Sequence, residues 1–283
     1  MSNIGEVERN LILGGAQFGN GYGKFLYTPK ISPENINEIL ESAKMRNVFE
    51  IDIAQDYVGA VENLANSNMS SQFIFSTKIK YSYDLQDDII SKLFTELKSL
   101  QVERFRTILV HNWGSISRDE RTKSVNFLKS LVSLGLCERV GVSIYEVKEI
   151  DFGTWIPNCI QAPLNFYNRE FLYDKATQNL VAEGTQFIGR SIFHQGLLLN
   201  PQLSSNVEEI RIFVDFCAEN NLSYLQGALS VYDSQSIFTS LVVGVANPSQ
   251  LQEILVEGSV VKNLSVYPAI NSVSLDFTDP RRW

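Results

Sequence analysis

The chain has 283 residues, of which 44% are hydrophobic and 20% are charged, as is usual for a globular protein with a large core. Its formal net charge is −8. Proteins that bind nucleic acid or an anionic membrane need clustered positive charge, so this balance disfavours both as partners. The first residues are acidic where a secretory signal is basic, and no apolar stretch reaches the roughly 20 residues of a membrane span. We therefore expect a cytoplasmic protein that acts on small molecules and binds neither nucleic acid nor membrane. The sequence leaves its oligomeric state open.

Short apolar runs alternate along the chain with longer segments of helix-like spacing. Runs that are apolar on both faces and separated by helical patterns indicate buried parallel strands. The predicted strands are Leu11–Gly15, Phe49–Ile53, Phe73–Lys78, Thr107–His111, Arg139–Ile144, Cys159–Leu164, Gln186–Ser191 and Leu241–Val245. Eight strands in this alternation predict an α/β fold of the (β/α)8 type, a TIM barrel.

Helix signals lie between the predicted strands. Ser32-Pro33-Glu34 combines a cap residue, a proline at the first helical position and an early acid. Asp84 is predicted to cap the helix between the third and fourth strands. Ser117 or Asp119 is predicted to cap the next helix, which should stop at Gly135.

The gap between the seventh and eighth strands is long enough for an extra helical segment. It holds two helical patterns, Asn206–Asn220 and Tyr224–Phe238. No low-complexity stretch, charge block or proline-rich linker marks a domain boundary. Because such barrels of roughly 250 residues routinely form one domain, we expect residues 1–283 to be a single barrel domain that includes this insertion.

Polar side chains end three consecutive predicted strands. Asp52, Lys78 and His111 close their runs, and Tyr57 follows Asp52 in the next loop. Taken singly, each has an ordinary explanation as a turn cap, a solvated rim charge or a hydrogen-bonded structural residue. In barrels of this kind, however, the active site lies at the C-terminal ends of the strands. The joint placement of the four at this end predicts a site.

These four side chain types suggest proton donation to a carbonyl oxygen. Tyrosine has an ordinary pKa near ~10, so it acts as a general acid near neutral pH only if its neighbours favour the phenolate. The ammonium of Lys78 would do so beside Tyr57, and the carboxylate of Asp52 could hold the lysine in place. His111 could hydrogen-bond the carbonyl oxygen, where negative charge develops. The set therefore predicts reduction of a carbonyl.

Several stretches around these residues resemble the aldo-keto reductase family. They follow the family's order from about residue 11 to residue 255. The spacing of Asp52 and Tyr57 and the sequence contexts of Lys78 and His111 are specific to the family, whereas the glycine motifs alone would be weak. The stretches are Leu13–Gly19, Ile51–Tyr57 with Glu62, Ser76–Lys78, Leu109–His111, Arg139–Ser143, Gln161–Asn165 and Gln195–Leu198. The resemblance implies an NAD(P)-dependent oxidoreductase with a small carbonyl substrate. It also implies that Tyr57 donates the proton, that Lys78 lowers its pKa, that Asp52 orients Lys78 and that His111 positions the carbonyl.

The resemblance implies a set of cofactor contacts as well. Ser143 and Gln161 match the family's contacts to the nicotinamide carboxamide and would orient the ring. Arg190 stands where the family commonly has an aromatic side chain that stacks on this ring, and its planar guanidinium could also stack. Ile144 stands where asparagine often follows the serine, so one carboxamide hydrogen bond is missing or comes from elsewhere. The implied cofactor-binding residues are Gln17, Asp52, Ser143, Gln161, Arg190, Gly196, Gly244, Asn247 and Gln250.

The segment Gly244–Leu251 resembles the part of the family that binds the adenosine phosphate. Relatives that prefer NADP usually carry lysine or arginine here, because a dianionic group needs paired positive charge. This segment has neither, although Asn247, Ser249 and Gln250 can offer neutral hydrogen bonds. We expect NADP as the cofactor and keep NAD as the open alternative.

The substrate cannot be chosen from the sequence beyond a carbonyl, which could be sugar-like. About half of the aromatic residues near the predicted barrel mouth could line a pocket, while the others pack under loops. They are Tyr22, Phe25, Tyr27, Trp113, Tyr145, Phe166, Tyr167 and Phe193. His194 falls at the end of the seventh strand, and we expect it to be a structural hydrogen-bonding residue in a loop.

Two other functions remain as alternatives. The chain could be a cofactor-binding regulatory or partner subunit with little turnover, although such a protein has no need of both Tyr57 and His111. It could also be an unrelated barrel enzyme, such as a sugar isomerase or a metal-dependent hydrolase, whose site gathers several His, Asp or Glu ligands. With two histidines in the chain, we predict no metal site. The three cysteines are widely spaced in apolar surroundings, so we expect buried free thiols.

Overall fold

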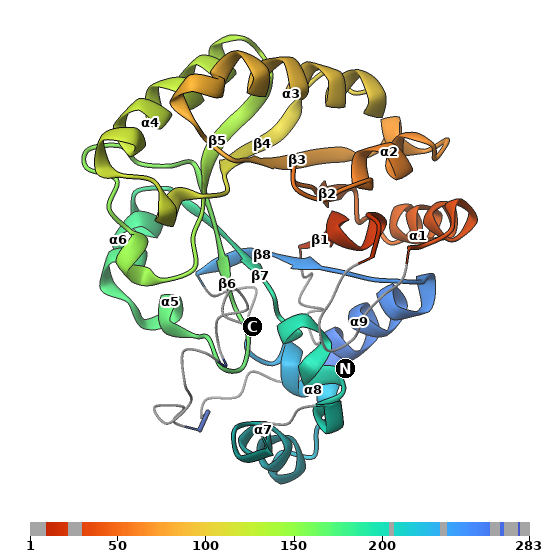
Figure 1. Ribbon diagram of the computed structural model, residues 1–283. Coiled ribbons are helices and arrows are strands. Elements are labelled where there is room, and N and C mark those ends of the chain that lie inside the picture. Colours follow the sequence, from red (N-terminus) through yellow and green to blue (C-terminus); the bar gives the residue numbers. More distant parts are fainter. Residues whose placement is uncertain are drawn as a thin grey trace, which may run out of the picture.

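A computed structural model describes residues 10–21, 30–203, 207–232, 237–260, 267, 268 and 277. Parallel strands pair in chain order, and β8 pairs with β1 to close an eight-stranded TIM barrel (Figure 1). The strands are β1 (Leu11–Gly14), β2 (Glu50–Asp52), β3 (Ile74–Ile79), β4 (Phe105–Val110), β5 (Cys137–Ser143), β6 (Cys159–Pro163), β7 (Gln186–Arg190) and β8 (Phe238–Val243). The predicted fold class and all eight predicted strands are confirmed, with ends that differ by up to three residues.

Helices surround the barrel (Figure 1). They are α1 (Pro33–Met45), α2 (Ala60–Ala65), α3 (Gln86–Leu100), α4 (Arg118–Ser133), α5 (Glu170–Tyr173), α6 (Lys175–Ala182), α7 (Val207–Glu219), α8 (Tyr224–Leu229) and α9 (Pro248–Val260). The helical insertion between the seventh and eighth strands is confirmed, because α7 and α8 lie there and pack on each other. None of the helices in the described ranges is long and apolar enough to cross a membrane.

The helix ends show which capping predictions hold. The side chain of Ser32 accepts a hydrogen bond from the backbone N–H of Asn35 at the start of α1. Ser117 begins α4 with a complete capping box, and the predicted stop at Gly135 is a left-handed residue with φ of 74°. Asp84 was wrong as a cap, because it lies in a 3-10 turn before α3 and its side chain caps nothing there.

The second helical pattern of the insertion is shorter than predicted. The helix α8 ends at Leu229, and β8 begins at Phe238, within the span predicted as helix. The run that includes Phe238 and Leu241 is buried against the rest of the core, so strand pairing with β7 and β1 wins over the helical spacing of this segment. Leu225 of α8 turns toward the barrel mouth and lines a cleft described below.

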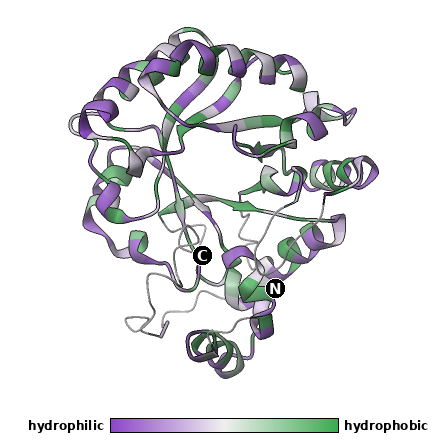
Figure 2. Cartoon of the chain, viewed as in Figure 1, coloured by the Kyte–Doolittle hydropathy of each residue, from purple (hydrophilic) through white to green (hydrophobic). Residues whose placement is uncertain are grey.

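Apolar side chains fill the space between the barrel and its helices, and the helices show one hydrophobic and one hydrophilic face (Figure 2). A separate, smaller apolar cluster is formed by side chains of five strands, β1, β4, β6, β7 and β8. It consists of Ile12, Leu109, Cys159 and Ile188, with Val242 packed against it. Because side chains alternate along a strand, this cluster occupies the barrel interior, two residues below the polar strand ends. Cys137, Cys159 and Cys217 are buried and free, as predicted.

The strands β5 and β6 approach each other closely at Gly141. A Cβ atom at this position would lie 1.8 Å from the carbonyl oxygen of Cys159, a backbone atom that cannot move alone. We expect Gly141→Ala to lower the free energy of unfolding in urea by at least about 3 kcal/mol. The control is Gly189→Ala, where the nearest atom belongs to the flexible side chain of Leu241 at 3.1 Å. Equal losses in the two variants would contradict this account of the strand packing.

Candidate active site

An ion pair between β2 and β3 lies at the centre of the strand ends. Lys78 Nζ donates a very short hydrogen bond to Asp52 Oδ2 and a second one of 3.2 Å to the carbonyl oxygen of Ile53. The side chains of Lys78 and Asp52 are only 1% and 5% exposed, so neither charge is solvated by bulk water. The two therefore depend on each other, as expected when one residue is to hold the other in place.

A third strand reaches the same carboxylate from across the barrel. Gln161 of β6 donates from Nε2 to Asp52 Oδ1 over 2.9 Å. This contact uses the second oxygen of Asp52 and leaves Gln161 Oε1 buried without a hydrogen-bond partner among the described residues. Ser143, at the end of β5, has a buried and unpartnered Oγ by the same measure. Buried polar atoms are almost always paired in proteins, so these two atoms are the ones that a ligand would be expected to satisfy.

Tyr57 lies in the loop between β2 and α2, half-buried beside this ion pair. Lys78 Nζ is 5.2 Å from the centre of its ring. Burial raises the pKa of Tyr57 well above its ordinary value, and the negative charge of Asp52 raises it further, whereas the guanidinium of Arg190 lowers it. The phenol therefore keeps its proton at neutral pH. Arg190 is therefore a cation that would favour the phenolate in addition to Lys78, which lies beside the ring.

His111 follows β4 directly, and its backbone N–H donates to the carbonyl oxygen of Ile79 at 2.8 Å. Its Nδ1 lies 3.4 Å from Asp56 Oδ2. Burial, followed by the charges of Lys78 and Arg190, lowers the pKa of His111 to about 4, against the opposite effect of Asp56 and Asp52. The imidazole is therefore neutral at pH 7.

Arg190 ends β7 and has its guanidinium stacked on an aromatic ring. The guanidinium carbon lies 4.1 Å from the centre of the Tyr145 ring. The same group donates to the carbonyl oxygen of Ile144 at 3.0 Å and to Ser191 Oγ at 3.4 Å. These contacts hold the planar group against the wall of the barrel mouth, facing Tyr57 and His111, whose pKa values it lowers.

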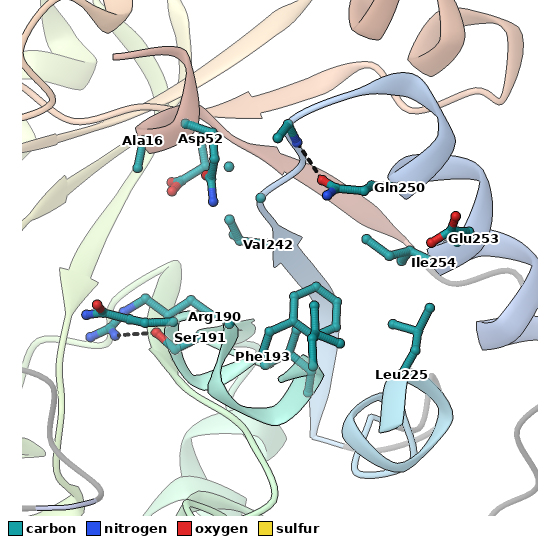
Figure 3. A pocket seen from close by; sticks show the side chains of 18 of the residues that line it. Ala16, Asp52, Arg190, Ser191, Phe193, Leu225, Val242, Gln250, Glu253 and Ile254 are labelled. Carbon is teal, nitrogen blue, oxygen red and sulfur yellow. Dashed lines mark hydrogen bonds between the residues drawn. The ribbon is translucent and has the colours of Figure 1, made fainter. Parts of the chain in front are cut away.

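A cleft of about 430 Å³ runs from Asp52 and Tyr57 across the mouth toward α8 and α9 (Figure 3). Many predicted cofactor-binding residues line it. They are Gln17, Asp52, Arg190, Gly196, Gly244 and Gln250. A Cβ atom at Gly244 would lie 2.1 Å from the end of the Gln17 side chain, so a larger residue there would displace Gln17.

Three of the nine predicted contacts, Ser143, Gln161 and Asn247, do not line this cleft. Asn247 caps α9, because its Oδ1 accepts from the backbone N–H of Gln250 at 3.0 Å. Gln250 in turn accepts a 2.7 Å hydrogen bond from the backbone N–H of Ala246 (Figure 3). These bonds fix the loop between β8 and α9.

The predicted aromatic residues divide between pocket and core. Phe193 lines the cleft, and the ring of Tyr145 stacks on the guanidinium of Arg190. Trp113, Phe166 and Tyr167 are buried in the core. Tyr22, Phe25 and Tyr27 lie outside the described residues. His194 is buried, and its Nε2 lies 2.9 Å from the carbonyl oxygen of Phe277, which confirms the predicted structural contact.

Sequence reasoning missed three residues of this site. Asp56 contacts His111, and Lys80 contacts Asp56 with 2.9 Å between Nζ and Oδ2. Glu253 of α9 lines the far end of the cleft (Figure 3). Asp56 could have been noticed as an acid next to Tyr57, but side chains in a loop follow no period that would predict their direction.

Comparison with known proteins identifies the chain's relatives. Its sequence matches the Aldo/keto reductase family over residues 10–274. A structure of a putative aldo-keto reductase from Pseudomonas aeruginosa superposes with a TM-score of 0.64 at 16% identity, over 88% of this chain and 89% of the other. A glycerol dehydrogenase from Gluconobacter oxydans superposes with a TM-score of 0.69 at 17% identity, over 90% and 88%. No curated protein matches this chain.

The barrel and the match over nearly its whole length define the class: the chain belongs to the aldo/keto reductase family. It is therefore an NAD(P)-dependent oxidoreductase that reduces a small carbonyl compound. Members of this family typically use NAD(P)H. The structural neighbours, at this low identity, add agreement on the fold.

The buried ion pair gives a prediction about stability. Lys78→Met leaves the carboxylate of Asp52 buried without its cation, so we expect the free energy of unfolding to fall by about 3–5 kcal/mol. The double variant Lys78→Met with Asp52→Asn removes both charges and should recover part of this loss in urea denaturation. A double variant that is no more stable than Lys78→Met would show that desolvation of Asp52 is not the cause.

Proposed function

We propose that this protein is an NAD(P)H-dependent reductase of an aldehyde or ketone in which Tyr57 donates the proton. The observation that supports this most is that Tyr57, a protonated and half-buried phenol, lines one cleft with Asp52 and lies beside the buried Lys78 that pairs with Asp52. General acid catalysis needs a donor that is protonated at the working pH and lies beside charged groups that stabilise its conjugate base once the proton has been transferred. Tyr57 meets both conditions.

The residues present fit a nicotinamide cofactor. A carboxamide has one acceptor and two donor hydrogens, and the unpartnered Ser143 Oγ and Gln161 Oε1 can donate to and accept from it. The absence of a side chain at Gly244 and the lining by Gln17 and Gly196 leave room for an extended ligand along the cleft. When bound, this cofactor supplies the hydride of the reduction.

The chain's own residues would supply the proton and the charge balance. Tyr57 would donate its proton to the carbonyl oxygen as negative charge develops there. The positive charges of Lys78 beside the ring and of Arg190 across the mouth would then stabilise the phenolate that remains. Asp52 would fix the position of Lys78, and Gln161 would fix Asp52. Because the pKa of Tyr57 is raised, the acid form of the donor should persist well into the alkaline range.

Tyr57→Phe tests the proton donor. The variant keeps the ring beside Lys78, so cofactor affinity, measured by fluorescence titration with NADH and NADPH, should change little. Single-turnover hydride transfer to 4-nitrobenzaldehyde should slow by about 10²- to 10⁴-fold. The control is Tyr173→Phe, at an exposed tyrosine of α5. Transfer at the wild-type rate in Tyr57→Phe would defeat the assignment, and tight cofactor binding without turnover on any aldehyde in the wild type would favour the regulatory alternative.

For the cofactor itself, the structure shifts the balance toward NAD. Arg190 is the only cation among the described residues that line the cleft, and it lies at the catalytic end. At the other end Glu253 adds a carboxylate on the same helix as Gln250 (Figure 3). A phosphate dianion at this end would meet negative charge and neutral groups, whereas a ribose hydroxyl could donate to a carboxylate. We therefore propose NAD in place of the NADP expected from the sequence.

Ala246→Arg tests this preference. The new cation would lie beside the cleft, so we expect the ratio of the Kd values for NADPH and NADH to fall by roughly tenfold. Ala246→Gln is the matched neutral control, since it adds a long side chain without charge. Glu253→Gln should lower the ratio as well, by removing repulsion. If Ala246→Arg changed both Kd values equally, the phosphate-binding end would lie elsewhere.

A further inference from the structure

The guanidinium of Arg190 is the only cation among the described residues that line the cleft. We propose that Arg190 makes the cleft bind the reduced nicotinamide cofactor more tightly than the oxidised one, because the oxidised ring carries a positive charge and the reduced ring carries none. The inference rests on the proposed function, since it concerns the cofactor named there. Binding of the two forms can be measured without turnover, so the two proposals can be tested apart.

Neutral groups hold Arg190 in place. Its guanidinium stacks on the ring of Tyr145 and donates to the carbonyl oxygen of Ile144 and to Ser191 Oγ (Figure 3). A guanidinium has five N–H donors and is always charged, so these contacts leave its charge uncompensated. In the part of the chain that the structure describes, no carboxylate forms an ion pair with Arg190.

The other charges of the barrel mouth cancel in pairs. Lys78 is paired with Asp52 in the interior, and Lys80 Nζ lies 2.9 Å from Asp56 Oδ2 nearer the surface. The two members of an ion pair have opposite and nearly equal effects on a third group, so each pair contributes little net charge. The net charge that acts on a group bound at the mouth therefore has the sign of Arg190.

The imidazole of His111 shows the effect of this balance on a ring that can become positive. Burial, followed by the charges of Lys78 and Arg190, lowers the pKa of His111 to about 4, against the opposite effect of Asp56 and Asp52. The mouth thus disfavours the positive form of a ring that is neutral otherwise. Oxidation of a reduced nicotinamide ring is a change of the same kind, from neutral to positive.

The atoms proposed to bind the carboxamide adjoin Arg190. The unpartnered Ser143 Oγ belongs to the residue before Ile144, whose carbonyl oxygen accepts from Arg190 at 3.0 Å. On the neighbouring strand, Arg190 pairs in register with Pro163, two residues beyond Gln161, whose Oε1 is also unpartnered. A carboxamide held by these two atoms would place its ring beside the guanidinium.

A cation at this position has different effects before and after the reaction. While the ring is neutral, the charge of Arg190 does not repel it. Once the hydride has gone to the carbonyl carbon and Tyr57 has given its proton to the oxygen, the ring is positive and is repelled. Charges in a partly buried site are screened little by salt. We therefore expect the oxidised cofactor to leave readily, and the cleft to hold the reduced form in a mixture of the two.

Fluorescence titration tests this discrimination, with NADH measured directly and NAD⁺ by displacement of bound NADH. In the wild type, the Kd for NAD⁺ should exceed that for NADH by roughly tenfold or more. Arg190→Gln removes the charge and keeps a planar donor, and it should lower the ratio of the two Kd values by roughly tenfold. Arg190→Lys keeps the charge and should retain most of the ratio. Equal Kd values in the wild type, or an unchanged ratio in Arg190→Gln, would overturn the proposal.

ADP-ribose, which lacks the nicotinamide ring, shows where the charge acts. Its Kd should be about the same in Arg190→Gln and in the wild type, and this binding also shows that the variant is folded. A loss of affinity for ADP-ribose as large as the change in the ratio would assign Arg190 to the phosphates and overturn the proposal.

The matched control is Arg121→Gln. Arg121 also stacks on an aromatic ring, with 5.1 Å to the ring of Trp113, and donates to the carbonyl oxygen of Trp113 at 3.2 Å. It lies outside the lining of the cleft, so its loss should leave the ratio of Kd values unchanged. An equal fall of the ratio in Arg121→Gln would contradict a local effect of Arg190.

The outcomes separate the two proposals. Tight binding of NADH without turnover on any aldehyde would count against the reductase function, while the ratio of Kd values would still decide the role of Arg190. Turnover with an unchanged ratio in Arg190→Gln would overturn the role of Arg190 and leave the reductase function standing. Absence of binding of both NADH and NAD⁺ would overturn both proposals.

Discussion

The charge on Lys78 is the constraint on which the rest of the site depends. Burying the charge of a lysine that is only 1% exposed costs free energy unless a carboxylate compensates it, and Asp52 on the neighbouring strand does so. The carboxylate has a second oxygen that also needs a partner, and Gln161 supplies it from the opposite side of the barrel. Three strands are thus tied together at the centre of the candidate site. The apolar cluster beneath them keeps water away from the pair from below.

Much of this could be predicted because barrel strands are regular. Each strand ends at the same face, so Asp52, Lys78 and Ser143 are placed at the mouth by position alone. Residues in loops escaped this reasoning. Asp56 lies in a tight turn, and its direction depends on hydrogen bonds between Tyr57, Val58 and the turn backbone that no sequence period reveals.

The helix end and the helix cap that were predicted wrongly have a similar physical cause. The segment after Tyr224 has helix-like spacing, but burial of Phe238 in the strand that closes the barrel matters more than local preference. Asp84 has the right residue type for a cap, yet a 3-10 turn over Tyr83–Leu85 takes the chain into α3 without it. Pairing and burial over long distances decided both cases, whereas Ser117, whose partner Glu120 is three residues away, was predictable from local sequence.

The same few charges have opposite effects on the two proton-carrying groups of the mouth. Asp52 lies close enough to Tyr57 to discourage loss of the phenolic proton, and Lys78 and Arg190 discourage gain of a second proton by His111. Burial strengthens both effects, because each charged form would be poorly solvated. The site is thus prepared with the proton on the tyrosine and a neutral imidazole beside it. Reduction of a carbonyl needs a proton donor in this state, since negative charge that forms on the substrate oxygen can be met without first drawing a proton from solvent.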